Sequence, residues 1–130
     1  MNLTEKDAAI AYARAWNRLD PNDFLALLAG DARYASQWVF EELEGLEAIS
    51  SYLTQKIRAV KAHAANNPNS KIRVEIGITK AGDVDRPCAY MKQGSNEVVV
   101  IFTVKDGKIS RYDSCIPQLY RPDKSNVYPI

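Results

Sequence analysis

Tyr34, Ser36 and Trp38 occupy every second position of one short segment, residues 31–38. Side chains of a β-strand alternate between its two faces, so a strand over this segment places all three on one face. Two large aromatic rings with polar edges and a hydroxyl group suit the wall of a cavity better than a plain core. This pattern predicts a surface that holds an apolar or ring-shaped molecule and orients it through hydroxyl groups.

Side chains that commonly carry acid–base or metal chemistry are scattered along the chain. His63 is the single histidine and lies in a polar context, so we expect it on the surface. Glu41, Glu42 and Glu44 follow the aromatic segment and are typical of a solvated acidic loop. A metal site needs a denser and more ordered set of oxygen ligands than such a loop supplies. The sequence therefore predicts neither a bound metal nor a cofactor.

Cysteine spacing, charge and hydropathy exclude several classes of protein. Cys88 and Cys115 lack the spacing of zinc sites and of disulfide frameworks, so we expect two reduced thiols. The 130 residues carry a net charge of +1, and basic residues form no stripe with aromatic ones, so neither nucleic acid nor a membrane is an expected partner. The longest apolar run, residues 98–102, is far too short to span a bilayer. The first residues lack a secretion-signal pattern, which predicts a cytoplasmic protein.

Helical segments precede the strands and must position the aromatic residues. Thr4 and Asp7 have the spacing of a capping box, which predicts a helix over residues 5–18 with an apolar stripe. Pro21 is expected to begin a second helix and Gly30 to end it.

A third helix is predicted between Gly45 and about residue 66. Its apolar face packs on the core, and Lys56 is expected on the solvent-facing side. The apolar positions are Leu46, Ile49, Tyr52, Leu53, Ile57 and Val60.

Beyond residue 70 the apolar period changes from that of a helix to that of a strand. We expect strands over about residues 72–79, 88–92, 97–105 and 108–116, joined as hairpins. Helices followed by hairpin-linked strands define the α+β class, here a curved antiparallel β-sheet wrapped around three N-terminal helices.

The domain organisation is simple, because the sequence shows no internal repeat. We expect one domain over residues 1–117. The polar, proline-containing segment 118–130 is predicted as a C-terminal tail.

Four sequence blocks, residues 15–28, 30–34, 45–49 and 106–109, follow each other in a characteristic order and spacing. Together they resemble the SnoaL-like members of the nuclear transport factor 2 (NTF2) superfamily over about residues 5–117. The resemblance implies a cystatin-like α+β cone with an internal pocket. Members include steroid isomerases, polyketide cyclases, dehydratases, epoxide hydrolases and pocket proteins, so the fold alone leaves the function open.

The resemblance also carries over three positions of the steroid isomerases. It implies that Tyr12 is an oxyanion donor on the first helix. Ser36 stands where those enzymes have their general base, and Val100 or a neighbour stands where they have a second acid. Steroid isomerisation needs a base near the substrate carbon, and serine cannot act as one unaided. We therefore expect steroid-isomerase activity to be absent.

The register of the last strand decides whether a base is available. The resemblance implies that Ser110, Tyr112, Ser114 and Ile116 face the pocket, and that Arg111, Asp113 and Cys115 face away. A slip of one residue exchanges the two faces and turns Asp113 inward, where it would supply a carboxylate.

The same implied arrangement gives a set of candidate ligand-binding residues. These side chains either surround an open pocket or fill the cone as an aromatic core that satisfies its own hydroxyls. The set is Tyr12, Trp16, Tyr34, Ser36, Trp38, Tyr52, Cys88, Tyr90, Phe102, Tyr112 and Ser114.

Three hypotheses for the function follow. The first is a protein that binds an apolar or aromatic small molecule in an aromatic-lined pocket. The second is an enzyme of the lyase or isomerase type, with Tyr12 as oxyanion donor and Asp113 as base. The third is a structural or protein-interaction module that uses the outer sheet face.

A homodimer through the sheet is also expected. Val99 and Ile101 are predicted to face outward, where they form an apolar patch with Tyr120 and Tyr128 of the tail.

Overall fold

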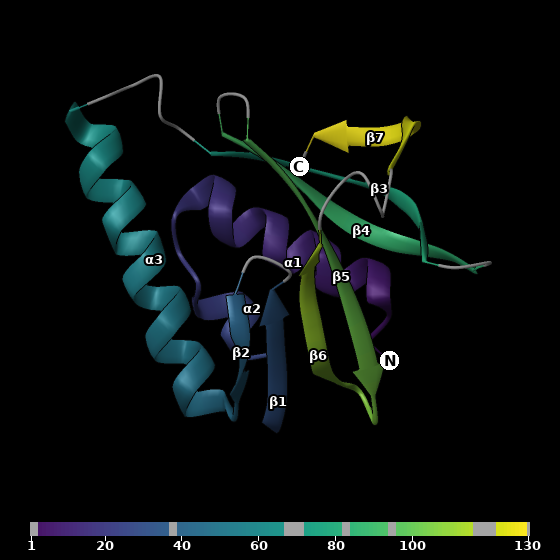
Figure 1. Cartoon of the computed structure of the whole chain (residues 1–130), viewed down its shortest axis with the longest axis horizontal. Helices are drawn as coiled ribbons and strands as arrows, with labels where there is room; N and C mark the ends of the chain where they lie inside the picture. The colour runs from purple at the N-terminus through teal and green to yellow at the C-terminus, as the bar shows by residue number, and fades with distance from the viewer. Residues whose placement is uncertain are drawn as a thin grey trace.

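A curved β-sheet wraps around the first helix in the computed structural model of this chain, which describes residues 3–36, 39–66, 72–81, 84–93, 96–115 and 122–129 (Figure 1). The helices are α1 (Glu5–Arg18), α2 (Asn22–Leu25) and α3 (Leu46–Asn66). The strands are β1 (Leu28–Ser36), β2 (Val39–Glu44), β3 (Arg73–Ala81), β4 (Val84–Gln93), β5 (Asn96–Lys105), β6 (Lys108–Cys115) and β7 (Pro122–Pro129). They form one sheet in the order β2-β1-β6-β5-β4-β3-β7.

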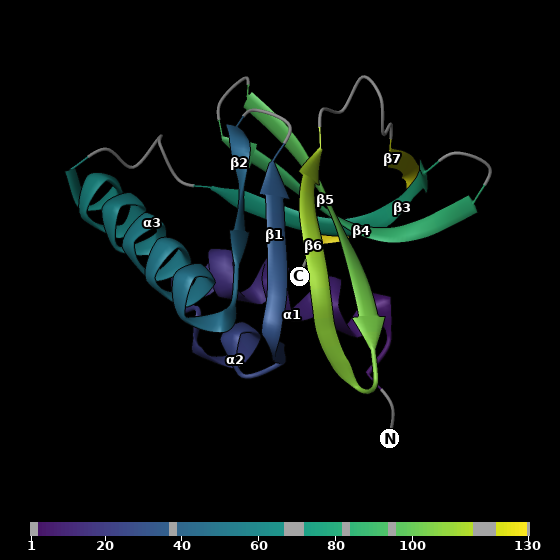
Figure 2. The same ribbon diagram turned by 60° about the horizontal axis from the view of Figure 1, so that its bottom comes forward.

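The sheet bends strongly, so that β3 and β4 run in a different direction from β1 and β6 (Figure 2). Helix α1 packs on β3, β4 and β5, and α3 packs on β1 and β2. The predicted α+β class, a curved sheet around the helices, is confirmed.

Helix α1 begins and ends where the sequence predicts. The Thr4 side chain accepts a hydrogen bond from the Asp7 backbone N–H, and the Asp7 carboxylate accepts one from the Thr4 N–H, both at 3.1 Å. Farther along the helix, the Asn17 amide bonds to both the N–H and the C=O of Val74, each at 2.9 Å. Because this amide joins α1 to β3, it fixes how the aromatic face of α1 meets the sheet.

The sheet differs from the predicted all-antiparallel arrangement in one place. Strands β1 and β6 pair in parallel, and the other pairings are antiparallel. The hairpin between β5 and β6 forms at Asp106 and Gly107 as predicted, with φ of 54° and 76°. These positive values suit a two-residue hairpin turn, and glycine adopts them without strain.

The second helix and the acidic segment after β1 were assigned incorrectly. Helix α2 ends at Leu25, and Leu28 already belongs to β1, where it pairs with Ile109 of β6, so Gly30 does not end the helix. The segment expected to be an irregular acidic loop forms β2 instead. Cross-strand pairing overrides a short helical pattern once a partner strand is available.

The C-terminal segment also contains regular structure. Strand β7 lies within the residues predicted as a tail and pairs antiparallel with β3 at one edge of the sheet.

Apolar side chains bury themselves on both faces of the sheet. The larger cluster lies on the concave side between the sheet, α1 and α3. A smaller cluster lies on the other face and consists of Cys88, Tyr90, Val99, Ile101 and Cys115. Val99 and Ile101 face outward as predicted, but they are 0% and 6% exposed in the single chain. The exposed apolar patch expected from them is therefore wrong.

Candidate ligand pocket

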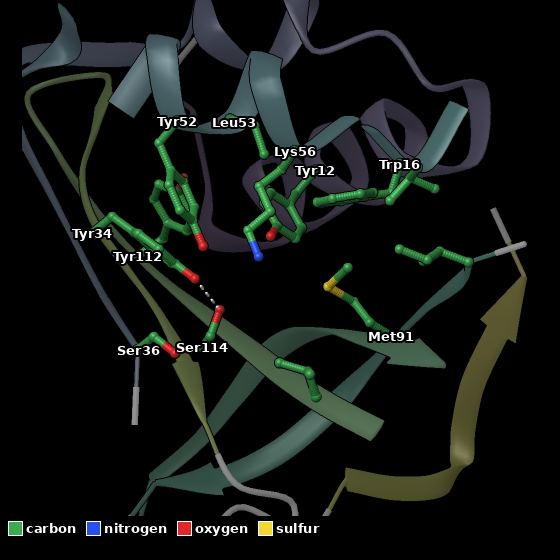
Figure 3. Close-up of a pocket in the computed structure, with 13 residues that line it drawn as sticks. Tyr12, Trp16, Tyr34, Ser36, Tyr52, Leu53, Lys56, Met91, Tyr112 and Ser114 are labelled. Carbon is green, nitrogen blue, oxygen red and sulfur yellow. Dashed lines mark hydrogen bonds between the residues drawn. The ribbon is translucent and has the colours of Figure 1, made fainter. Parts of the chain in front are cut away.

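A cavity of about 320 Å³ lies between α1, α3 and the concave side of the sheet, and it is partly open to solvent. Figure 3 shows the side chains that line it. Its wall is mostly aromatic and aliphatic, with hydroxyl groups and one ammonium group. The lining residues are Tyr12, Trp16, Tyr34, Ser36, Tyr52, Leu53, Lys56, Val60, Ile72, Met91, Val98, Tyr112 and Ser114.

One wall of the pocket comes from the parallel pair β1 and β6. Tyr34 lies beside Tyr112, and Ser36 lies beside Ser114. The two tyrosine rings stack with centroids 4.4 Å apart. The parallel register pairs tyrosine with tyrosine and serine with serine, so the wall has one layer of tyrosines and one layer of serines.

The deep end of the cone is filled. Tyr12, Phe24, Phe102 and Tyr112 form a cluster in which Tyr12 and Phe24 meet edge to face at 5.0 Å and Tyr12 and Phe102 at 5.5 Å. Phe102, predicted as a lining residue, is 0% exposed and lies beneath the pocket. The cone is therefore filled by an aromatic core at its deep end and holds an open pocket above it, so each of the two arrangements considered from the sequence occurs in one part of the cone.

Hydrogen bonding on the pocket wall is incomplete. The Tyr34 hydroxyl and the Ser114 Oγ share a hydrogen bond of 2.8 Å. By contrast, the Tyr112 hydroxyl and the Trp16 indole N–H are buried and have no hydrogen-bond partner in the described part of the chain. The Trp16 N–H lies close enough to the Tyr12 hydroxyl to affect its pKa, without reaching hydrogen-bond geometry.

Burial keeps the tyrosines of the pocket neutral. Desolvation raises the pKa of Tyr34 to about 12. It also raises the pKa of Tyr12 and of Tyr112 well above the ordinary value of a phenol. All three hydroxyls are therefore protonated at neutral pH.

Lys56 is a pocket residue that the sequence analysis placed on the solvent side. It shares one face of α3 with Tyr52 and Val60, because these residues are four positions apart. Figure 3 shows the Lys56 Nζ turned into the pocket, on the same side as the Tyr12 hydroxyl. Tyr52, Lys56 and Val60 all line the cavity.

Two predicted pocket residues lie on the opposite face of the sheet. Cys88 and Tyr90 belong to the outer cluster, and their neighbours Ala89 and Met91 face the concave side. The expected register of β4 was wrong by one residue, which exchanges the faces of every side chain. Trp38 lies outside the described residues.

The carboxylate considered as a base also lies away from the pocket. Asp113 is on the outer face, where the Arg111 guanidinium donates to it at 2.9 and 3.1 Å. The implied orientation of β6 is thus confirmed for Tyr112, Ser114 and Asp113, and the alternative register is excluded. Ser110 does not line the pocket, because it is the extra residue of a bulge opposite β5. Ile116 lies outside the described residues.

Arginines and acids form a chain of ion pairs on that outer face. Arg33 of β1 contacts Glu42 at 2.9 Å and Glu44 at 3.2 Å on β2. Arg111 of β6 contacts both Glu42 and Asp113. Glu42 and Glu44 are therefore part of a strand-to-strand network and do not form a solvated loop. Groups of acidic, histidine or cysteine side chains able to hold a metal ion are absent among the described residues.

Six lining residues were missing from the predicted set. Leu53, Lys56, Val60, Ile72, Met91 and Val98 line the cavity in addition to the expected residues. For α3 a signal exists in the spacing of Tyr52, Lys56 and Val60. Met91 lies between Tyr90 and Lys92, and Val98 lies between Glu97 and Val99. Each therefore has an apolar neighbour on the opposite face, and alternation alone does not choose between the two faces.

The architecture is that of a small cone with a one-sided pocket, and the family comparison agrees with it. Residues 9–112 match the model of the SnoaL-like domain. This match spans most of the sequence, and the chain belongs to the SnoaL-like family, within the NTF2-like fold. No curated protein matches the chain at a significant level.

Solved structures show the same fold at low sequence identity. A SnoaL-like protein of unknown function from Burkholderia thailandensis superposes with a TM-score of 0.62 at 17% identity, covering 92% of this chain and 98% of that one. A protein named as a polyketide cyclase from Sinorhizobium meliloti gives a TM-score of 0.60 at 21% identity, covering 84% and 94%. An uncharacterised cystatin-fold protein from Novosphingobium aromaticivorans gives 0.59 at 19%, covering 88% and 100%. These likenesses show the fold alone.

Among the described residues, no helix combines the length and the apolar character needed to cross a lipid bilayer.

Proposed function

We propose that this protein binds a small apolar or aromatic molecule that carries a hydrogen-bond acceptor. The observation that supports this most directly concerns Tyr112, a pocket residue that is 1% exposed and whose hydroxyl has no hydrogen-bond partner among the described residues. Buried polar groups are nearly always paired, and leaving one unpaired costs about 1–3 kcal/mol. An acceptor atom on a bound ligand would supply the missing partner.

The size and the surface of the pocket fit such a ligand. The volume of about 320 Å³ is at the lower end of the range for small-molecule sites, roughly 300–1,000 Å³, and is enough for a two-ring molecule. The rings of Tyr52 and Trp16 and the flexible thioether of Met91 offer contact area without a polar requirement.

The enzyme hypothesis has less support. Neither a carboxylate nor an imidazole is among the described lining residues, and Asp113 is engaged with Arg111 on the other face. Tyr12 remains a suitable oxyanion donor, but proton transfer from carbon also needs a positioned base. Related structures include proteins named as a polyketide cyclase and as a ketosteroid isomerase, which is compatible with a ring-shaped ligand here.

Calorimetric titration with two matched probes tests the proposal. 2-Acetonaphthone carries a carbonyl acceptor, and 2-ethylnaphthalene has a similar shape without one. We expect the wild type to bind 2-acetonaphthone more tightly. Tyr112→Phe should lower the affinity for 2-acetonaphthone by about five- to tenfold, the effect of one hydrogen bond, and leave the affinity for 2-ethylnaphthalene unchanged.

Tyr90→Phe is the matched control, because it removes the same hydroxyl from a tyrosine on the outer face. It should leave both affinities unchanged. Wild-type protein that binds neither probe, or a Tyr112→Phe variant with unchanged preference for the ketone, would contradict the proposal.

We also propose a cytoplasmic location and a homodimer through the sheet. With Val99 and Ile101 buried in the single chain, self-association would have to use polar side chains of the outer face. Sedimentation as a monomer at high micromolar concentration would contradict the proposed dimer.

A further inference from the structure

The charge on the pocket wall is positive. Among the lining residues that the structure describes, Lys56 is the single charged side chain and none is acidic. The other polar groups are tyrosine and serine hydroxyls and the Trp16 N–H, all of which can donate a hydrogen bond. A ligand inside the cavity therefore meets a cation and several donors.

Lys56 is also uncompensated, unlike the arginines across the sheet. It makes no ion pair within the described part of the chain, and its Nζ lies 5.5 Å from the centroid of the Tyr52 ring. This cation–π contact orients the ammonium group without neutralising its charge. Arg33 and Arg111, by comparison, each contact two carboxylates.

The position of Lys56 makes pairing with a ligand favourable. The side chain is exposed at the open side of the pocket, so an anion can approach it without being fully dehydrated. Hydrogen bonds between charged partners are roughly twice as strong as neutral ones, and the same ammonium group repels a cationic ligand. Trp16 and Met91 line the same cavity as Lys56 and supply apolar surface beside it (Figure 3).

We infer that the pocket selects an aromatic carboxylate, whose ring occupies the apolar part of the cavity and whose carboxylate pairs with Lys56. The inference rests on the proposed ligand-binding function and adds the charge of the ligand to it. The Tyr12 hydroxyl, which burial keeps protonated, also lines this cavity.

The test compares 2-naphthoate with 2-acetonaphthone, which share the ring and the carbonyl and differ in charge. We expect the wild type to bind 2-naphthoate about tenfold more tightly at low ionic strength, and added salt to reduce the difference. Lys56→Gln should bring the two affinities to within about twofold by weakening the naphthoate alone.

Lys61→Gln is the matched control on the same helix. Lys61 lines a separate surface hollow with Arg18 and Arg58, where an anion could also gather, and it does not line this pocket. The control should keep the tenfold preference. Loss of the preference in Lys61→Gln as well would overturn the inference, because it would place the anion outside the pocket.

The remaining outcomes distinguish failure of this inference from failure of the proposed ligand-binding function. If 2-acetonaphthone binds and 2-naphthoate is no tighter, or if the preference survives in Lys56→Gln, the inference is wrong and the ligand-binding function stands. If neither probe binds the wild type, both are wrong.

Discussion

The two faces of strands β1 and β6 satisfy their polar groups in opposite ways. On the outer face, Arg33 and Arg111 are each held by two carboxylates of the same chain. On the inner face, Tyr34 is hydrogen-bonded to Ser114. The hydroxyl of Tyr112, directly beside Tyr34, has no partner in the part of the chain that the structure describes. The same two strands thus carry a completed network on one side and an incomplete one on the other.

This difference separates a structural surface from a binding surface. Charged groups on the outer face already form ion pairs with each other, so binding a further molecule there would add little free energy. The inner face keeps buried donors beside a cavity, and Lys56 of α3, which makes no ion pair among the described residues, lines the same cavity. A ligand can satisfy those groups, which is why the inner face is the place to look for function.

The largest effect is expected from the aromatic cluster under the pocket. Phe102→Ala removes a fully buried ring that contacts both Tyr12 and Tyr112. The free energy of unfolding should fall by about 3–5 kcal/mol, the usual cost of a cavity left by a phenylalanine. Urea denaturation followed by circular dichroism measures it. A loss below about 1 kcal/mol would show that the cone is not closed at its deep end.

The second largest effect is expected from alkaline pH, which should lower the free energy of unfolding through the buried tyrosines of the inner face. Tyr34 has a pKa of about 12 in the folded chain and about 10 when unfolded. Below pH 10 both states keep the proton, and stability is unaffected. As the pH rises from about 10 to 12 the unfolded chain releases the proton first, so stability falls, on the order of 2–3 kcal/mol from Tyr34 alone.

Denaturant titrations at about pH 8 and pH 11, with phenolate absorbance recorded in parallel, should show about half of this fall, because pH 11 lies midway between the two pKa values. Tyr34→Phe is expected to reduce the fall. Phenolate forming in the folded protein near the ordinary pKa of a phenol would disprove the burial argument.

A pair of hydroxyl deletions sharpens the contrast within the inner face. Tyr34→Phe breaks the bond to the buried Ser114 and should cost about 1 kcal/mol, or roughly 3–5 °C in melting temperature. Tyr112→Phe removes a hydroxyl that has no partner, so the free protein should be unchanged or slightly more stable. Differential scanning calorimetry compares the two. Equal losses in both variants would mean that Tyr112 has a partner in the ligand-free protein.

The smallest effect is expected on the outer face. Arg111→Gln removes the cation shared by Glu42 and Asp113, but these side chains are 23–39% exposed and screened by water. The loss should stay below about 1 kcal/mol at low salt and vanish at high salt. Arg73→Gln is a control, since the Arg73–Glu75 pair is long, at 3.8 Å, and Arg73 is 71% exposed. A loss that salt does not change would indicate a packing role for Arg111.

Local pattern determined much of this protein from the sequence. The capping box and apolar stripe gave the bounds of α1, the Asp106–Gly107 pair gave the β5–β6 hairpin, and alternation placed Tyr34 and Ser36 on one face. These features depend on residues a few positions apart, and periodicity reports such relations directly.

Only the tertiary structure decided the rest. The parallel pairing of β1 with β6, the register of β4 and the inward turn of Lys56 depend on partners far away in the sequence. Where both faces of a strand are apolar, as around Cys88 and Tyr90, alternation carries no information about which face is inside. The pocket is a space between elements, so its size and its unpaired donors follow from how α1, α3 and the sheet pack together, which no single segment specifies.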